Sequence, residues 1–420
     1  MLRKNLNFDG LGRPALIIFL ATMTGGACNY LYQSFMGHSL DPAEYSLLSS
    51  LLSIFYILGV PGTLLGTTVV RYVAKMRGEG KDKEIAWFLR RSFIISMAVG
   101  AVLFLAIIIS SPWLKTFLSI TDENTIILLG LGAFLTMLGP PAVGGTQGLK
   151  RFHLLGLYNI FGPIGKLALG VLFVTVGMGV GGAFGAMVVG TSLAFGIVYY
   201  AIWDYVKKDK TAIEMRGVYI YTIPVAVSTI CFTLITNIDT FLVRGLMADH
   251  DAGIYSSASM LGKIVLWLPG AITIVTFPRF SEKRIDETHM LMRKSVWLVG
   301  LTLGMVWTGF LLFPDVVMRI AYGAPYADAA ECLPVVILAF ALFGLASVFM
   351  KYGMATSDHV YAWIIAAFTV IGVLLVIANH ATPLDVGYDM LFTSAGICTC
   401  SVIYMEASWR RSKKRSMTKG

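Results

Sequence analysis

The chain has 420 residues, of which 56% are hydrophobic and only 14% are charged, and its mean hydropathy is +0.74. Soluble domains average about 25% charged residues, so this composition excludes a soluble globular protein and indicates an all-α integral membrane protein. The five cysteines show no CxxC spacing, and most lie in apolar runs, which argues against a disulfide framework or a metal site.

Twelve apolar runs reach the length of about 20 residues that a membrane-spanning helix needs. They lie near residues 14–36, 44–70, 92–114, 124–149, 153–177, 180–203, 217–244, 252–278, 295–314, 331–352, 359–379 and 388–406. The fifth and sixth runs form one apolar block of about 50 residues, which is too long for a single span. We divide it at the glycine-rich segment 177–182, because glycine commonly ends helices.

The positive charges alternate strongly between successive loops. With the N-terminus placed in the cytoplasm, 28 of the 33 Lys and Arg residues fall in cytoplasmic segments. Lys115, Arg244 and Arg319 fall in external loops, and Lys166 and Lys263 lie inside apolar runs. Cytoplasmic loops of membrane proteins are enriched in Lys and Arg, so we expect both termini in the cytoplasm.

The net charge of +9 is then explained by membrane orientation and by anionic lipid, and no nucleic-acid partner is expected. The external loops are short and carry acidic residues instead, Asp385 and Asp389 among them. No soluble domain is inserted, so a catalytic site would have to be built from short loops or from the helices.

An internal repeat relates the second and eighth runs. They begin with AEYSLLSS and GIYSSASM, and each continues to a Pro-Gly pair with an arginine nine residues after the glycine, Arg71 and Arg279. The two runs are six helices apart. An even number of helices places both repeats in the same orientation, related by a pseudo-twofold axis along the membrane normal.

The repeat predicts two six-helix lobes, an N-terminal lobe of residues 1–206 and a C-terminal lobe of residues 207–420. The second lobe ends in a basic cytoplasmic tail, residues 407–420. A substrate path between two such lobes is the expected architecture.

Several separated stretches resemble the Wzx-type polysaccharide and oligosaccharide flippases, a branch of the superfamily that includes the lipid II flippases and the MATE exporters. The matching stretches are MGHSLDPAEYSLLSSLLSIFYIL (residues 36–58), VVRYVAKMRGEGK (69–81), NIDTFLVRGLMADHDAGIYSSASML (237–261) with the following LPGAITIVTFPRFSE, and FPDVVMRIAYGAPYADAAECLPVVILA (313–339).

The resemblance implies an alternating-access flippase, and not an enzyme, that moves a lipid-linked (polyprenyl-diphosphate) oligosaccharide across the cytoplasmic membrane for cell-surface polysaccharide biosynthesis. Membrane lipid, and the polysaccharide polymerase or export machinery, are the partners it implies. No cofactor is expected apart from Na⁺ or H⁺ as a coupling ion.

Two lysines lie near the middle of their predicted spans, where a charge is costly. Lys166 is 13 residues into the fifth run, and Lys263 is 11 residues into the eighth. From opposite lobes they could bind a diphosphate as point charges, in line with the cationic cavity that the resemblance implies. The alternative is a lysine that extends its charged end towards the membrane surface or pairs within the helix bundle.

Asp239 is the one carboxylate that we place inside a span. With oxygens from Asn237 and Thr240 it could bind and release a proton or Na⁺, and lipid II flippases have a similarly placed aspartate in a sodium site. The alternative is a structural ion pair with Arg244 or Lys263. Arg244 is also a candidate for binding substrate.

Four further polar residues are candidates for binding substrate. Arg71 and Arg279 end the repeated helices at the cytoplasmic interface, where they would either anchor the helices or capture a lipid phosphate. Asn29 and Gln33 lie four residues apart on one face of the first helix, and would either line a cavity for sugar hydroxyls or bond neighbouring helices.

Three other functions remain as alternatives. A MATE-like exporter of cationic small molecules is disfavoured because the charges inside the spans are mainly positive. A membrane glycosyltransferase would need carboxylate clusters or a large external loop, and neither is present. A non-transporting scaffold of a polysaccharide assembly complex would share the fold.

Overall fold

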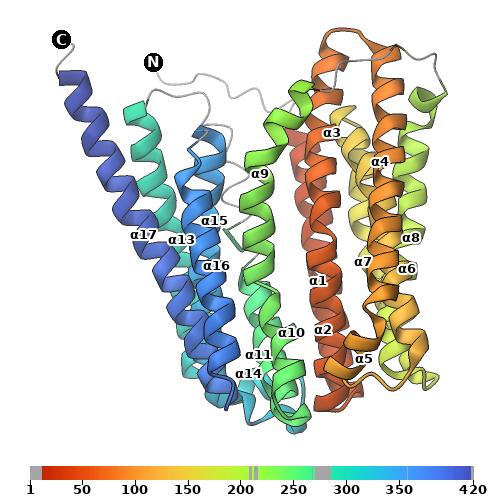
Figure 1. The fold of residues 1–420 in the computed structure, drawn as a ribbon, viewed down its shortest axis with the longest axis vertical. Helices are drawn as coiled ribbons and strands as arrows, with labels where there is room; N and C mark the ends of the chain where they lie inside the picture. Colours follow the sequence, from red (N-terminus) through yellow and green to blue (C-terminus); the bar gives the residue numbers. More distant parts are fainter. Residues whose placement is uncertain are drawn as a thin grey trace. The chain divides into compact units, whose positions relative to one another are not determined.

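The computed structural model describes residues 12–207, 211, 216–266, 268–269, 285–356 and 358–417, and in these residues the chain forms helices and no strand (Figure 1). Eight of the described helices are long and apolar enough to cross a membrane, and two bent helix pairs raise the number to ten. The first predicted run coincides with helix α1 (Gly12–Ser39), and the eighth begins in α11 (Asp249–Val265). The predicted all-α membrane fold is therefore confirmed.

The chain divides into two compact units. Unit 1 comprises Met1–Ser39 and Leu58–Thr222, and unit 2 comprises Leu40–Ile57 and Ile223–Gly420. Helix α2 (Pro42–Leu58) therefore packs almost entirely in unit 2, although its neighbours in the sequence belong to unit 1. The predicted lobes, 1–206 and 207–420, stay a prediction.

Unit 1 is built around three mutually packed helices, α6, α7 and α8. Its helices are α1, α3 (Val60–Gly78), α4 (Asp82–Ile109), α5 (Ser111–Phe117), α6 (Glu123–Gly148), α7 (Phe152–Thr175) and α8 (Gly179–Val206). Helix α7 packs against both α1 and α8, and α6 packs against α3, α4 and α8. Large apolar side chains fill the space between these helices, among them Val73, Phe88 and Ile202.

The turn between α7 and α8 confirms the predicted division of the long apolar block. Helix α7 ends at Thr175 and α8 begins at Gly179. Gly177 and Gly179 have φ angles of 89° and 51°, in the left-handed region that favours glycine. The glycine-rich sequence therefore lets the chain reverse direction within a few residues.

A second glycine fixes how closely α7 and α8 approach. A Cβ atom on Gly190 of α8 would lie 2.4 Å from the backbone nitrogen of Lys166 and 2.8 Å from the carbonyl carbon of Gly165, both on α7. Two helix backbones meet here without an intervening side chain, as small residues allow in membrane proteins. The position of Lys166 is therefore set by backbone contact.

Unit 2 is organised around α15, which packs against α11, α13 and α17. Besides α2 and α11 the unit contains α9 (Arg216–Ile235, from Ile223 onward), α10 (Ile238–Leu246), α13 (Ile285–Leu312), α14 (Pro314–Ala321), the 3₁₀ turn η1 (Ala324–Tyr326), α15 (Ala329–Thr356), α16 (Val360–Ala378) and α17 (Pro383–Met417). Helices α16 and α17 lie side by side, joined at the lower end in Figure 1.

Two of the predicted spans are broken rather than continuous. The second ends as α2 at Leu58 and resumes as α3 at Val60, with Pro61 in the first turn of α3, where its missing N–H removes no helical bond. The seventh is bent by 40° between α9 and α10. Asn237 precedes the first residue of α10 without a capping hydrogen bond from its side chain, and its side-chain amide donates back to the Thr233 carbonyl at 2.9 Å. The break lets α10 direct polar side chains into unit 2.

Candidate functional site

Asp239 is the centre of a buried polar cluster in unit 2. It lies in the first turn of α10 and is 0% exposed. One carboxylate oxygen accepts hydrogen bonds from Ser259 Oγ at 2.5 Å and from the Tyr255 hydroxyl at 3.1 Å, both on α11. The other oxygen lies 3.5 Å from Lys263 Nζ and has no hydrogen-bond partner among the described residues.

Lys263 completes this cluster from the last turn of α11. Its Nζ donates to Ser53 Oγ on α2 and to Thr240 Oγ1 on α10, each at 3.2 Å. The side chain is 12% exposed. Of the two ion pairs considered for Asp239, the structure therefore shows the one with Lys263, and this pair joins three helices of unit 2.

Arg244 forms a second buried junction, near the other end of α10. Its Nη1 lies 2.8 Å from Asp249 Oδ1 and donates to Ser46 Oγ at 3.0 Å and to the Ala43 carbonyl at 3.3 Å. Arg244 was expected in a loop, and this is wrong, because the residue lies in the last turn of α10 and is 5% exposed. It ties the start of α2 to α10 and α11.

Three tyrosines pack against one another near the same end of α2. The Tyr45 hydroxyl donates to the Tyr322 hydroxyl at 3.1 Å, and both rings pack against Tyr326. Gly253 allows α11 to approach the start of α2 closely, since a Cβ there would lie 2.2 Å from the Pro42 carbonyl oxygen. This cluster was not predicted, because Tyr45 lies 277 positions from Tyr322 in the sequence.

We predict that Arg244→Gln lowers the free energy of unfolding by about 1.5–3 kcal/mol, because hydrogen bonds to a charged group are lost in a buried position. Arg319→Gln is the control, because Arg319 is an exposed arginine of α14 in the same unit. Thermal unfolding of the detergent-solubilised variants measures the effect. Equal shifts for the two variants would contradict the structural role of Arg244.

Lys166 is the corresponding buried cation of unit 1, at 5% exposure. Its Nζ donates to Asn29 Oδ1 at 3.2 Å and lies 4.1 Å from the centre of the Tyr32 ring, both on α1. The Tyr32 hydroxyl is itself held by the Ala183 carbonyl at 2.8 Å. Among the described residues Lys166 has no carboxylate partner, and its ammonium group contacts only neutral side chains.

The structure therefore gathers the predicted residues into two groups. Asp239, Thr240 and Lys263 meet in unit 2, and Lys166 and Asn29 meet in unit 1. Three other predicted residues lie outside these two groups: Gln33 is buried on α1, Asn237 hydrogen-bonds within its own turn, and Arg71 is exposed on α3. Arg279 lies outside the described residues. The described residues contain no group of three His, Cys, Asp or Glu that could hold a metal ion.

A family profile described as "Polysaccharide biosynthesis protein" matches residues 76–331, which is more than half of the chain. The chain belongs to the polysaccharide biosynthesis protein family. It is a multi-pass membrane protein, in which eight to ten spans of the described residues are long and apolar enough to cross a membrane.

Relatives and solved structures agree with this family fold. A relative from Methanocaldococcus jannaschii, described as an uncharacterized membrane protein, is 21% identical over 369 residues, which are 81% of this chain and 82% of the relative. The inward-facing MATE-family multidrug resistance transporter superposes with a TM-score of 0.72 at 16% identity, covering 94% of this chain and 98% of that one. The lipid II flippase MurJ, in its inward closed conformation, gives 0.70 at 14% identity, covering 94% and 87%. These structures share the chain's fold, and the profile match confirms the predicted resemblance to a polysaccharide family.

Proposed function

We propose that this member of the polysaccharide biosynthesis protein family is a flippase that moves a polyprenyl-diphosphate-linked oligosaccharide across the cytoplasmic membrane by alternating access. Its termini would face the cytoplasm, and the product would pass to polysaccharide polymerase or export machinery. The family description and the fold shared with the lipid II flippase support this proposal. The observation that carries it is the environment of Lys166.

Lys166 is a buried ammonium group whose described partners are all neutral. Burying a charge without a counter-ion is costly, so such a group is retained where a ligand or a partner supplies the opposite charge. An anionic diphosphate would supply it, and lysine binds phosphate as a compact point charge. Asn29 and Gln33 on the adjoining helix would add hydrogen bonds to the phosphate or the first sugar.

Lys263 would bind the diphosphate in only part of the transport cycle, because in this structure it is paired with Asp239. A proton or Na⁺ on the carboxylate of Asp239 would remove the charge that attracts Lys263. The Asp239 oxygen without a hydrogen-bond partner would accept that ion, with Thr240 and Asn237 nearby. Ion binding and the release of Lys263 for the diphosphate would thereby be coupled, and the ion gradient or the membrane potential would give direction.

The test is flipping of a short-chain polyprenyl-diphosphate oligosaccharide in reconstituted vesicles. Lys166→Gln is expected to slow flipping at least about tenfold, because one charge-assisted contact to phosphate is lost. Lys166→Arg should retain part of the rate, and Lys115→Gln is the control because Lys115 pairs with Glu123 at the surface. If Lys166→Gln flips the lipid at the wild-type rate, the proposal is contradicted.

The same vesicles distinguish the alternatives. A MATE-like exporter would move a cationic dye and leave the lipid-linked saccharide in place, whereas the uncompensated Lys166 should repel such cargo. A non-transporting scaffold would move neither compound, and would still support polysaccharide assembly in cells carrying Lys166→Gln.

A further inference from the structure

Tyr32 of α1 faces the buried ammonium group of Lys166 in unit 1. The centre of its ring lies 4.1 Å from Lys166 Nζ, within the distance of about 6 Å over which an aromatic ring attracts a cation. Tyr32 is 0% exposed and Lys166 is 5% exposed. Because so little water reaches the pair, the attraction is stronger than it would be at the protein surface.

The Tyr32 ring is held in place by two neighbouring helices. Its hydroxyl donates to the Ala183 carbonyl of α8 at 2.8 Å. Gly170 of α7 leaves the room that the ring needs, since a Cβ there would lie 2.8 Å from Tyr32 Cε2. Gly170 follows Lys166 by one helical turn, so the two residues lie on the same face of α7. The ring therefore occupies a space beside Lys166 that a larger residue at position 170 would fill.

The backbone contact between α7 and α8 fixes only the base of the Lys166 side chain. Lysine carries its charge on a flexible stem of four carbons, so other contacts must place the ammonium group. Asn29 and Tyr32 lie three residues apart on one face of α1, and both contact the ammonium. Asn29 Oδ1 accepts from one of its three N–H groups and the ring attracts another, which leaves a donor for a ligand.

We infer that Tyr32 is a positioning residue, which holds the Lys166 ammonium in one place before an anionic ligand binds. A carboxylate in this position would pair with the ammonium, as Asp239 does with Lys263, and would compete with a phosphate. The ring attracts the ammonium and leaves its positive charge uncompensated. The role toward a ligand rests on the proposed flippase function, whereas the placement of the ammonium does not.

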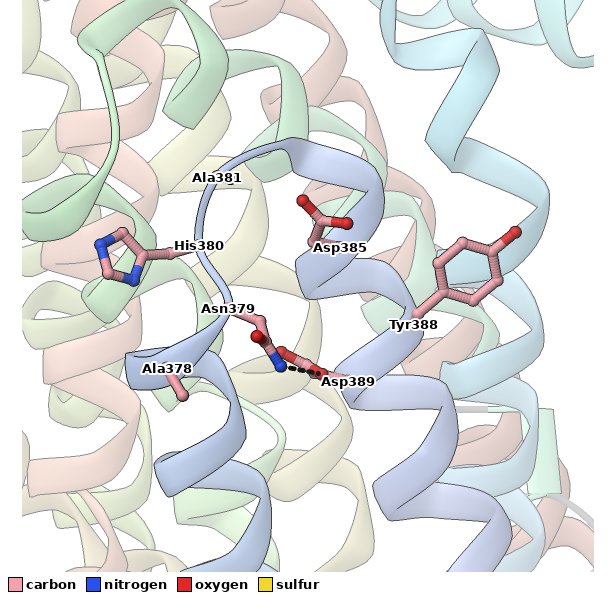
Figure 2. A pocket seen from close by; sticks show the side chains of 7 residues that line it. All are labelled: Ala378, Asn379, His380, Ala381, Asp385, Tyr388 and Asp389. Atoms are coloured by element: carbon pink, nitrogen blue, oxygen red, sulfur yellow. Dashed lines mark hydrogen bonds between the residues drawn. The ribbon is translucent and has the colours of Figure 1, made fainter.

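A hollow in unit 2, where α16 ends and α17 begins, offers no similar place for an anion (Figure 2). Its lining includes the carboxylates of Asp385 and Asp389 and no lysine or arginine. Carboxylates repel a phosphate, so an anionic ligand is expected at Lys166 and not in this hollow.

The first test is the melting temperature of the purified full-length protein with Tyr32→Phe and with phenylalanines at position 32 that carry an increasing number of ring fluorines. Fluorine withdraws electron density from the ring face and changes its shape little, so each step weakens the attraction to a cation. The bond to Ala183 is lost equally throughout this series. We expect the melting temperature to fall stepwise, and to stay constant when the series is repeated with Lys166→Met.

The second test is flipping of the lipid-linked oligosaccharide in reconstituted vesicles. Tyr32→Leu is expected to raise the half-saturating concentration of this lipid about tenfold, because the ammonium loses one of its two contacts. The fluorinated series should raise it stepwise. Tyr199→Phe is the control for the lost hydroxyl, because Tyr199 donates to the Leu138 carbonyl at 2.8 Å and its ring stacks on Phe93. It should leave the half-saturating concentration unchanged.

The two measurements separate this inference from the proposed function. A melting temperature that does not depend on fluorination, or depends on it equally with Lys166→Met, overturns the placement of the ammonium by Tyr32. Flipping that is slowed by Lys166→Gln but unaffected by fluorination overturns the role of Tyr32 toward the ligand. If the melting temperature shows the Lys166-dependent trend and Lys166→Gln flips normally, the placement is upheld and the proposed flippase site is contradicted.

Discussion

Lys263→Met is expected to lower the free energy of unfolding by about 3 kcal/mol, because it leaves the buried carboxylate of Asp239 without its counter-charge. Methionine has a similar length and no charge, so the change removes the ion pair with little change in volume. Thermal unfolding of the protein in detergent measures the loss. Lys115→Met serves as the control, because its salt bridge to Glu123 is exposed to solvent and should contribute little to stability.

The double variant Asp239→Asn/Lys263→Met separates the ion pair from the packing. Asparagine can still accept hydrogen bonds from Ser259 and Tyr255, and no buried charge remains. Most of the lost stability should therefore return, because replacing both partners of a buried pair is often close to neutral. Transport should be lost in this double variant if Lys263 also binds substrate. A double variant as unstable as Lys263→Met alone would show that the destabilisation comes from packing and not from charge.

Gly190→Ala is expected to give the second large effect. The added Cβ would meet the α7 backbone at 2.4 Å, and backbone atoms cannot move aside as a flexible side chain can. Overpacking of this kind costs about 1–3 kcal/mol. Because the contact is at the backbone nitrogen of Lys166, α7 should shift and weaken the contacts of Lys166 with Asn29 and Tyr32. Thermal unfolding and the flipping assay should therefore both show a loss.

Gly196→Ala is the matched control in the same helix. A Cβ at Gly196 would have no atom within 4 Å, so the substitution adds no clash. Alanine also favours helix over glycine by about 1 kcal/mol in helix interiors, so stability should stay equal or rise slightly. If both alanine variants behave alike, the close approach of α7 and α8 does not determine the position of Lys166.

The membrane fold could be predicted because its signals are local in the sequence. Apolar run length indicates a span, and the glycines of segment 177–182 indicate a turn, which the structure confirms with positive φ at Gly177 and Gly179. The breaks at Gly59 and at residues 236–237 could not be placed from the apolar runs, since a run interrupted by one or two residues has nearly the same hydropathy as a continuous helix. Only Pro61 indicated a bend beside the first of them. Asp389 was grouped with the acids of the external loops, whereas it is buried in the second turn of α17.

The candidate site could be predicted only as a set of residues. Burial of Lys166, Asp239 and Lys263 was expected from their depth in apolar runs, and the structure bears it out. The pair of Asp239 with Lys263 was one of two alternatives, and their other partners could not be predicted. Ser53 meets Lys263 across 210 positions of sequence, and Asn29 meets Lys166 across 137.

By itself the sequence determined the fold class, the approximate spans and the polar residues that those spans bury, because hydrophobic length and charge act locally along the chain. Only the tertiary structure decided that Asp239 is paired with Lys263, that Lys166 has neutral partners, and that α2 packs in unit 2. The physical reason is that these contacts join helices far apart in sequence. Which helix faces meet depends on small residues such as Gly190 and Gly253 that allow close packing, and periodicity within one helix does not specify its neighbour.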